Sequence, residues 1–452
     1  MPIGVNTALT SLTIANATTS TAVITVPNIG SGAITTTTGT GVTGAVSIGN
    51  TSADSIVMSG DIYKTGGAVT LTTEGGSDAA DIEIDFTKEA AVFIATSGDN
   101  VSLVGGDVSL ANGSHLTIDT NIGDGETNGG NISIDGGIDG TSDENLTLDA
   151  HSSGTGTITL AKVGQAEHTG LTASEINTLT ATAGGGITLG GNITTSDAND
   201  TPGVDINGDV ILSASVTITT DSGGTDGTID ISGGIDGTTG SHQNLIIDSG
   251  TANVTIGSGT GTQVIGSTEA KALNKIEINK TDGAGAETGT ITIDDIGTAT
   301  TYGAGTNGTT TDAVYIGNAH TTAVVLNGAE YNFNNSVYIQ AAAAGSNDDI
   351  RIDGASPTFQ ATNDTITFET GVINLASGLT TIQSNNGPIT LTAVYGQGDE
   401  DLTVDAGASD AGNDATVSVG IIGHGTGTST SEISICLLYT SDACRRLWLC
   451  RS

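Results

Sequence analysis

Aspartate and glycine gather in turns that offer oxygen ligands at close spacing. The motif GGIDGT starts at Gly136 and again at Gly233, and the stretch DANDTPGVDINGD starts at Asp197. Carboxylate and amide oxygens at this density are ligands that suit Ca²⁺. However, the chain has no tandem G-G-x-G-x-D motif and no D-x-D-x-D-G loop with a downstream glutamate. We therefore expect Asp and Gly to make turns, and calcium binding stays open as an alternative without assigned ligands.

Catalytic side chains have no recognisable spacing in this sequence. The histidines form no H-x-H or H-E-x-x-H pattern, and no G-x-S-x-G motif lies between a strand and a helix. A carboxylate pair can cleave glycosides, but 49 acids before residue 436 single out no pair, and only seven basic residues are there to hold an acidic sugar. The sequence predicts a chain that is not an enzyme, with no catalytic, cofactor-binding or metal-binding residue. The histidines, expected as solvated turn residues, are His115, His151, His168, His242, His320 and His424.

Three of the six lysines lie close together in the stretch KALNKIEINK. They are Lys271, Lys275 and Lys280. Lysine on a strand commonly protects an exposed sheet edge from pairing with another chain. We therefore expect an edge strand here and not a binding patch.

The charge balance excludes several classes of partner. The formal net charge is −40, and a chain without a basic patch cannot neutralise nucleic-acid phosphates or bind an anionic membrane electrostatically. No run of about 18 apolar residues is present, so the sequence predicts no membrane-spanning segment. The start of the chain lacks the basic and apolar regions of a secretory signal. The composition therefore argues against nucleic acid and anionic membranes as partners.

Short alternating runs predict the secondary structure. Runs such as VTLTT, NISID, NLTLDA and TIDIS place apolar residues at every second position, which is the period of half-buried strands. Clusters of Gly, Asp, Asn, Ser and Thr separate these runs and predict turns. The sequence therefore predicts an all-β protein in spite of its low aromatic content of 3%.

Internal repeats predict how the strands are arranged. The stretch at Asn131, NISIDGGIDGTSDENLTLDA, is answered at Thr228 by TIDISGGIDGTTGSHQNLIIDS. Similar repeats start at irregular intervals, whereas a string of immunoglobulin-like sandwiches would keep a fixed domain length. The expected inward residues are Ile, Val, Leu, Ala and Thr, which suit the narrow interior of a solenoid. We predict a rod-like right-handed β-solenoid, or parallel β-helix, with tandem immunoglobulin-like β-sandwiches as the alternative.

The repeats suggest a division of the chain into four segments. Residues 1–301 carry β-solenoid repeats, and residues 302–368 form an aromatic-rich β segment that continues the rod. Residues 369–435 return to the repeats, and residues 436–452 form a tail of different composition. The aromatic-rich segment holds seven of the eleven Phe and Tyr residues that precede the tail.

The repeat style resembles a known group of proteins. The runs LTIDT, NLTLDA and GTITL between Gly, Thr and Asp turns are similar to those of bacterial filamentous-haemagglutinin-like proteins and autotransporter adhesin passengers. This resemblance implies a non-catalytic structural or adhesive segment of a large secreted or cell-surface protein, associated with the outer membrane and with biofilm. It implies surface glycans, or the surfaces of host or neighbouring cells, as partners. The alternatives are a carbohydrate-active β-helix enzyme and a calcium-dependent surface-layer component.

The last residues resemble translated adapter sequence. Cys436, Cys444 and Cys450 are the only cysteines of the chain, and they lack the C-x-x-C spacing of a zinc site. The stretch CLLYTSDA is encoded by TGT CTC TTA TAC ACA TCT GAC GCT, which resembles the transposase mosaic-end adapter used in sequencing libraries. We therefore expect residues 436–452 to be an artefact and the natural chain to continue past Ile435.

Overall fold

The computed structural model describes most of the chain, with gaps at several turns and near the end. The described residues are 2–15, 23–33, 36, 38–74, 84–122, 128–141, 143–164, 175–196, 202–221, 226–257, 263–280, 288–305, 314–342, 349–362, 364–376, 378–385, 387–396, 400–407, 415–423 and the backbone of 434–438. They fall into two compact units, residues 1–228 and 229–452. Each unit is described by itself.

The first unit consists of short strands joined by turns. Its strands are β1 (Leu12–Ile14), β2 (Val23–Val26), β3 (Val46–Gly49), β4 (Ser55–Met58), β5 (Ile62–Lys64), β6 (Val69–Thr72), β7 (Ile84–Phe86), β8 (Ala91–Ala95), β9 (Val101–Val104), β10 (Val108–Leu110), β11 (His115–Asp119), β12 (Ile132–Asp139), β13 (Asn145–Asp149), β14 (Ile158–Val163), β15 (Thr178–Thr182), β16 (Ile187–Leu189), β17 (Ile193–Thr194), β18 (Pro202–Asn207), β19 (Val210–Leu212) and β20 (Val216–Thr219).

The second unit has the same character and one short helical turn. That turn is the 3₁₀ helix η1 (Glu269–Lys271). The strands are β21 (Thr228–Ile231), β22 (Ile235–Gly237), β23 (Asn244–Asp248), β24 (Val254–Ile256), β25 (Val264–Ile265), β26 (Lys275–Ile278), β27 (Thr290–Ile293), β28 (Asp295–Ile296), β29 (Val314–Ile316), β30 (Ala323–Leu326), β31 (Glu330–Phe333), β32 (Val337–Gln340), β33 (Ile350–Ile352), β34 (Thr358–Ala361), β35 (Ile366–Glu369), β36 (Ile373–Leu375), β37 (Leu379–Ser384), β38 (Ile389–Gly396), β39 (Asp401–Asp405), β40 (Val417–Ile422) and β41 (Ser434–Leu438).

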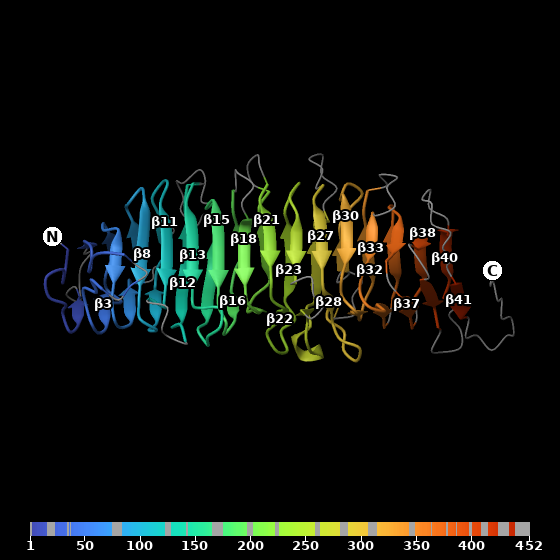
Figure 1. Ribbon diagram of the computed structural model, residues 1–452, viewed down its shortest axis with the longest axis horizontal. Helices are drawn as coiled ribbons and strands as arrows, with labels where there is room; N and C mark the ends of the chain where they lie inside the picture. The colour runs from blue at the N-terminus through green and yellow to red at the C-terminus, as the bar shows by residue number, and fades with distance from the viewer. Residues whose placement is uncertain are drawn as a thin grey trace. The chain divides into compact units, whose positions relative to one another are not determined.

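Within each unit, strands from successive coils pair in parallel. In the first unit β8 pairs with β11, β11 with β13, and β13 with β15, and Figure 1 shows these four strands side by side. In the second unit β29, β32 and β35 pair in the same way. The prediction of an all-β parallel solenoid is confirmed. The immunoglobulin-like alternative is wrong, because such sandwiches are built from antiparallel strands.

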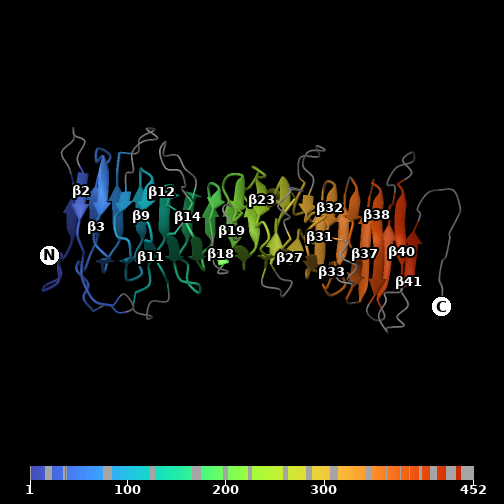
Figure 2. The same cartoon turned by 90° about the horizontal axis from the view of Figure 1, so that it is seen from above.

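The alternating residues become continuous columns inside the coils. Leu116 pairs with Leu146 and Leu146 with Leu179, and all three side chains are fully buried. The same holds for another set of paired strands, where β9, β12 and β14 lie side by side in Figure 2 and bury Leu103 and Ile134. Because the side-chain period of a strand is two, the residues between them point outward. The core therefore consists of stacked Ile, Val and Leu, as the pattern predicts.

Glycines at the ends of strands allow adjacent coils to approach each other closely. Gly49 and Gly317 follow buried isoleucines at the ends of β3 and β29, and their φ angles are 79° and 76°. A Cβ atom at Gly49 would lie 2.1 Å from the carbonyl oxygen of Thr72, and one at Gly317 would lie 2.2 Å from that of Gln340. Only glycine fits both the positive φ and the close approach of the next coil.

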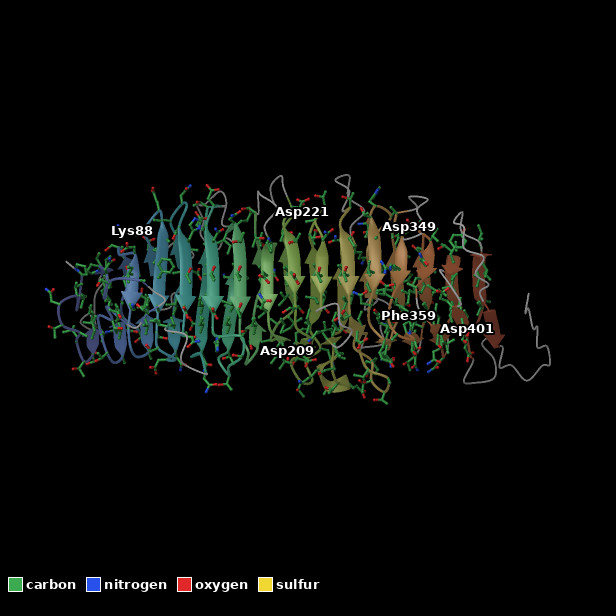
Figure 3. The ribbon with its side chains drawn as sticks, viewed as in Figure 1. Lys88, Asp209, Asp221, Asp349, Phe359 and Asp401 are labelled. Atoms are coloured by element: carbon green, nitrogen blue, oxygen red, sulfur yellow. The ribbon has the colours of Figure 1, made fainter. Side chains whose placement is uncertain are left out.

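The aromatic-rich segment places most of its rings inside the coil. Tyr331 and Phe359 stack with centroids 4.5 Å apart, and Phe359 meets Phe368 edge-on at 5.6 Å. All three side chains are fully buried, and Figure 3 labels Phe359. In these coils aromatic rings take the buried positions that aliphatic side chains occupy in the other coils.

The segment boundaries and the tail remain predictions. β41 continues the parallel ladder beyond β39, with Leu402 opposite Ile435 and Thr403 opposite Cys436. Residues 439–452 lie outside the described residues. Across the described part of the chain, no helix is long and apolar enough to cross a membrane.

We expect the two faces of one strand to respond differently to truncation. Leu148→Ala should lower the free energy of unfolding by about 3 kcal/mol, because Leu148 is fully buried and its loss leaves a cavity. The adjacent Thr147→Ala should change the free energy of unfolding by less than about 0.5 kcal/mol, since its side chain points outward. Urea unfolding measures both changes, and equal effects would contradict the assignment of faces.

Candidate functional site

Aspartates next to glycines accept hydrogen bonds from backbone amides of neighbouring coils. Asp107 Oδ1 accepts a hydrogen bond of 2.6 Å from the Gly137 amide, and Asp135 Oδ1 accepts one of 2.9 Å from the Gly105 amide. Asp209 directly precedes β19, and Figure 3 labels it at a turn. A carboxylate used in this way satisfies an amide that the turn would otherwise leave unpaired. Asp107 precedes β10, as a turn residue would, but Asp135 and the GGID residues of the first motif lie inside β12, where its register with β14 shifts, so the turn expected there is wrong.

The part of the chain that the structure describes has no cluster of His, Cys, Asp and Glu side chains for a metal ion. No group of three or more His, Cys, Asp or Glu residues there could hold a metal ion. Residues 197–201 of the DANDTPGVDINGD stretch lie outside the described residues. Asp205 from the same stretch accepts a hydrogen bond from Asn207 Nδ2 at 2.9 Å. Calcium binding therefore stays a prediction.

A buried tyrosine joins two chain segments at one corner of the first unit, residues 26–28 and residues 60–63. Tyr63 Oη accepts a hydrogen bond of 2.6 Å from the Gly60 amide and donates one of 3.2 Å to the Val26 carbonyl oxygen. Asn28 Oδ1 accepts the Asp61 amide at 2.7 Å. We call this arrangement a tyrosine corner. Burial is the main reason that the pKa of Tyr63 is raised, so its hydroxyl stays protonated and keeps both bonds.

The second unit repeats the tyrosine corner. Tyr331 Oη accepts the Gly328 amide at 2.7 Å and donates to the Ile293 carbonyl oxygen at 3.2 Å. Asp295 Oδ1 replaces Asn28 and accepts the Ala329 amide at 2.6 Å. The sequences GDIY and GAEY carry the repeated element, so a search for Gly-x-x-Tyr would have found both corners. The sequence analysis did not single them out.

One lysine is buried although its sequence context suggests exposure. Lys64 is fully buried, and its ammonium group donates hydrogen bonds to the carbonyl oxygens of Ala33 at 2.7 Å and Thr38 at 2.5 Å. Burial lowers the pKa of Lys64. The side chain ties the loop before β3 to β5, so its role is structural.

A cluster of hydrogen-bonded polar side chains surrounds η1 in the second unit. Asp236 Oδ2 accepts hydrogen bonds from Lys271 Nζ at 2.9 Å and from Ser267 Oγ at 2.8 Å. Tyr302 Oη donates to Glu269 Oε1 at 2.8 Å. Burial, helped by this bond and by the charge of Glu269, raises the pKa of Tyr302 to about 12. These contacts link η1 to β22 and to the loop after β28.

The lysine cluster is not at a sheet edge, which corrects the expectation from the sequence. β26 pairs with β23 on one side and with β29 on the other. Glu277 lies between Lys275 and Lys280 and forms ion pairs with both, at 2.7 Å to Lys275. Although burial opposes ionisation, the two lysines hold the pKa of Glu277 below its ordinary value. The repeat pattern shows strand faces but not neighbours, so it could not distinguish an inner strand from an edge strand.

Outward positions form columns of hydroxyl side chains. We define the first hydroxyl column as the residues that pair in sequence from β1 to β16. Its members are Thr13, Ser47, Thr70, Ser102, Ser133, Thr159 and Thr188. The second hydroxyl column lies on β11, β13 and β15 and contains Thr117, Thr147 and Thr180. Adjacent strands are about 4.8 Å apart, so each column presents regularly spaced donors and acceptors.

The histidines lie on separate parts of the solenoid. His115 begins β11, and His151 contacts Ser153 Oγ through Nε2 at 3.0 Å. His242 Nδ1 lies 3.0 Å from the Ala272 carbonyl oxygen, and the His320 amide donates to Asn318 Oδ1 at 2.6 Å. His168 and His424, together with Cys444 and Cys450, lie outside the described residues.

The fold and these contacts define a class of protein. The chain is a repeat protein built as a parallel β-helix, with polar residues on its outer faces. No family model, no curated protein and no solved structure matches it. Its function therefore has to be inferred from the described residues.

We expect the tyrosine corner to stabilise the second unit. Tyr331→Phe should lower the free energy of unfolding by about 1–3 kcal/mol, because the buried Gly328 amide and Ile293 carbonyl both lose their partner. Tyr302→Phe is the matched control, since it removes a hydroxyl at a partly exposed position. Denaturant unfolding distinguishes the two, and an equal loss in both variants would contradict the proposed role of the corner.

We expect mild acidification to stabilise the protein. Burial raises the pKa of several carboxyl groups above the ordinary value. They belong to Asp85, Asp205, Asp295, Glu330 and Asp405. Such groups bind protons more tightly in the folded state, so stability increases as pH falls from neutral towards the unfolded pKa values. Protonation also reduces the repulsion within a chain of net charge −40.

Thermal unfolding at constant ionic strength measures this effect. The Tm should be higher at about pH 5.5 than at about pH 7.5. Glu277 acts in the opposite direction, because its stabilising contribution is lost only as pH falls below its ordinary pKa of 4.5. Asp85→Asn should raise the Tm near neutral pH and reduce the gain on acidification. A Tm that falls steadily from neutral to mildly acidic pH would contradict the expectation.

Proposed function

We propose that this chain is a non-catalytic structural and adhesive segment of a large secreted or cell-surface repeat protein. The first hydroxyl column is the observation that carries the proposal. It extends over seven paired strands of the first unit and offers the same chemistry at each. A catalytic site needs a single concentrated group of side chains, whereas a repeated outer surface suits repeated weak contacts.

Neutral surface glycans, or cell surfaces that carry them, fit this surface best. A hydroxyl group both donates and accepts hydrogen bonds, and so does each hydroxyl of a sugar. Contacts that are weak one at a time become strong when several are linked, since each later contact is intramolecular. The net charge of −40 disfavours polyanions. The partner class proposed is therefore an uncharged polysaccharide.

The polar side chains around η1 support a structural role. Tyr302 is bonded to Glu269, and Lys271 is bonded to Asp236. The first contact links η1 to the loop after β28, and the second links η1 to β22. We infer that the stability of the coils, and not a reaction, accounts for these polar contacts.

A surface location is part of the same proposal. Its support is the resemblance of the repeat runs to bacterial adhesin passengers and the outward polar columns. Cysteine is missing before residue 436, so the folding of residues 1–435 does not depend on disulfides and is compatible with export in an unfolded state.

We expect the purified chain to bind insoluble uncharged polysaccharides and to release no sugar from them. Sedimentation with cellulose, chitin and β-glucan particles measures binding, and an assay for new reducing ends measures turnover. Retention on at least one polymer without turnover would support the proposal. Release of reducing ends would contradict it and favour the carbohydrate-active enzyme.

Two triple variants test which hydroxyl column contacts the polysaccharide. One replaces Ser102, Ser133 and Thr159 of the first hydroxyl column by alanine, and the other replaces Thr117, Thr147 and Thr180 of the second column. Both remove three outward hydroxyls, so they serve as controls for each other, and neither should change the Tm by much. One of the two should reduce binding several-fold. Unchanged binding in both would contradict adhesion through these columns.

A further inference from the structure

Two tyrosines face each other on the outer surface of the second unit. Tyr315 of β29 and Tyr338 of β32 are directly paired in a parallel ladder, and both are partly exposed. Their ring centroids are 4.9 Å apart and their planes differ by 9°. The parallel register makes the two side chains leave the backbone in the same direction. Corresponding ring carbons therefore lie next to each other.

A lysine holds this pair from the other side. Lys280 Nζ lies 3.8 Å from the centroid of Tyr315, in a cation–π contact, and Lys280 also forms an ion pair with Glu277. Tyr315 is therefore enclosed between a fixed cation and the ring of Tyr338. Packing on both faces limits the rotation of Tyr315 away from its partner.

We propose that Tyr315 and Tyr338 are a site of oxidative cross-linking, at which a haem peroxidase and hydrogen peroxide convert the pair into dityrosine. Each phenol loses one electron and its hydroxyl proton, and a carbon–carbon bond forms between the ring carbons next to the two hydroxyls. The hydrogen displaced from each of these carbons moves to the phenol oxygen as the ring regains aromaticity. The two electrons and two protons reduce one hydrogen peroxide to two water molecules.

The position of this pair distinguishes it from Tyr63, Tyr331 and Tyr302. Tyr63 and Tyr331 are fully buried with hydrogen-bonded hydroxyls, and Tyr302 donates its hydroxyl to Glu269. Reacting groups that are held in contact combine far faster than groups that must meet by diffusion. Radicals formed at Tyr315 and Tyr338 therefore combine with each other before they reach another chain.

The product would connect two adjacent coils covalently. Residues 1–435 contain no cysteine, so a disulfide is not available to these coils. A cross-link between residues 315 and 338 restricts the unfolded chain as a disulfide does. The inference concerns a modification of the coil and does not depend on what the outer surface binds.

Oxidation of the purified full-length chain tests the proposal. We would treat it with horseradish peroxidase and hydrogen peroxide, follow dityrosine fluorescence, and identify linked peptides by mass spectrometry after proteolysis. The expected result is one peptide pair that joins residues 315 and 338, with a mass lower by two hydrogens. Its yield per chain should not change with protein concentration, and the chain should remain a monomer on a denaturing gel.

Matched variants complete the test. Tyr338→Phe keeps the stacked rings and should abolish the linked peptide, whereas Tyr395→Phe, at a partly exposed position in β38, should leave the yield unchanged. Tyr315→Phe is the second variant and should behave like Tyr338→Phe, with circular dichroism confirming that both fold. The oxidised wild-type chain should have a higher Tm than oxidised Tyr338→Phe. Equal fluorescence in wild type and Tyr338→Phe, or cross-links only between chains, would overturn the proposal.

Discussion

The in-register parallel pairing of successive coils is the constraint on which the other features depend. Because each strand lies directly beside the equivalent strand of the next coil, every side chain meets a side chain from the same position. Leu116, Leu146 and Leu179 form one such buried column, and Tyr315 and Tyr338 form one on the outside. A one-residue slip would turn an apolar column towards water. Hydrophobic burial therefore fixes the register.

Turns have to accommodate coils of unequal length without leaving polar groups unsatisfied. Side chains supply the missing partners, as Asp107 does for the Gly137 amide and Asn28 for the Asp61 amide. In the tyrosine corners one hydroxyl serves both an amide and a carbonyl. Many of the acids that give the chain its charge lie at turns, so net charge and coil closure have a common cause. Other acids lie within strands, where burial raises the pKa of Asp85 in β7 and of Asp295 in β28.

Where successive coils repeat the same aliphatic residues in the core, they also repeat the same polar residues on the outer surface. A strand with period two alternates a buried aliphatic residue with an outward polar one, and stacking turns both into columns. The first hydroxyl column is thus a direct result of the core that lies beneath it. Local differences, such as the polar contacts at η1 and the Lys280–Tyr315 contact, occur in the second unit.

Residue types at nearby positions were enough to predict the period-two strands, the aliphatic core and the polar turns. The low number of cations is read directly from the composition. The parallel solenoid also followed, since repeats of irregular length exclude a domain array. The sequence did not show that β26 has a neighbour on each side, that Lys64 is buried, or that Tyr315 stacks on Tyr338. Those features depend on which coil lies beside which. Because the number of residues in a turn can vary at little entropic cost, the spacing along the sequence does not specify these neighbours. Local pattern therefore determined the faces of the strands, and only the tertiary structure decided their neighbours.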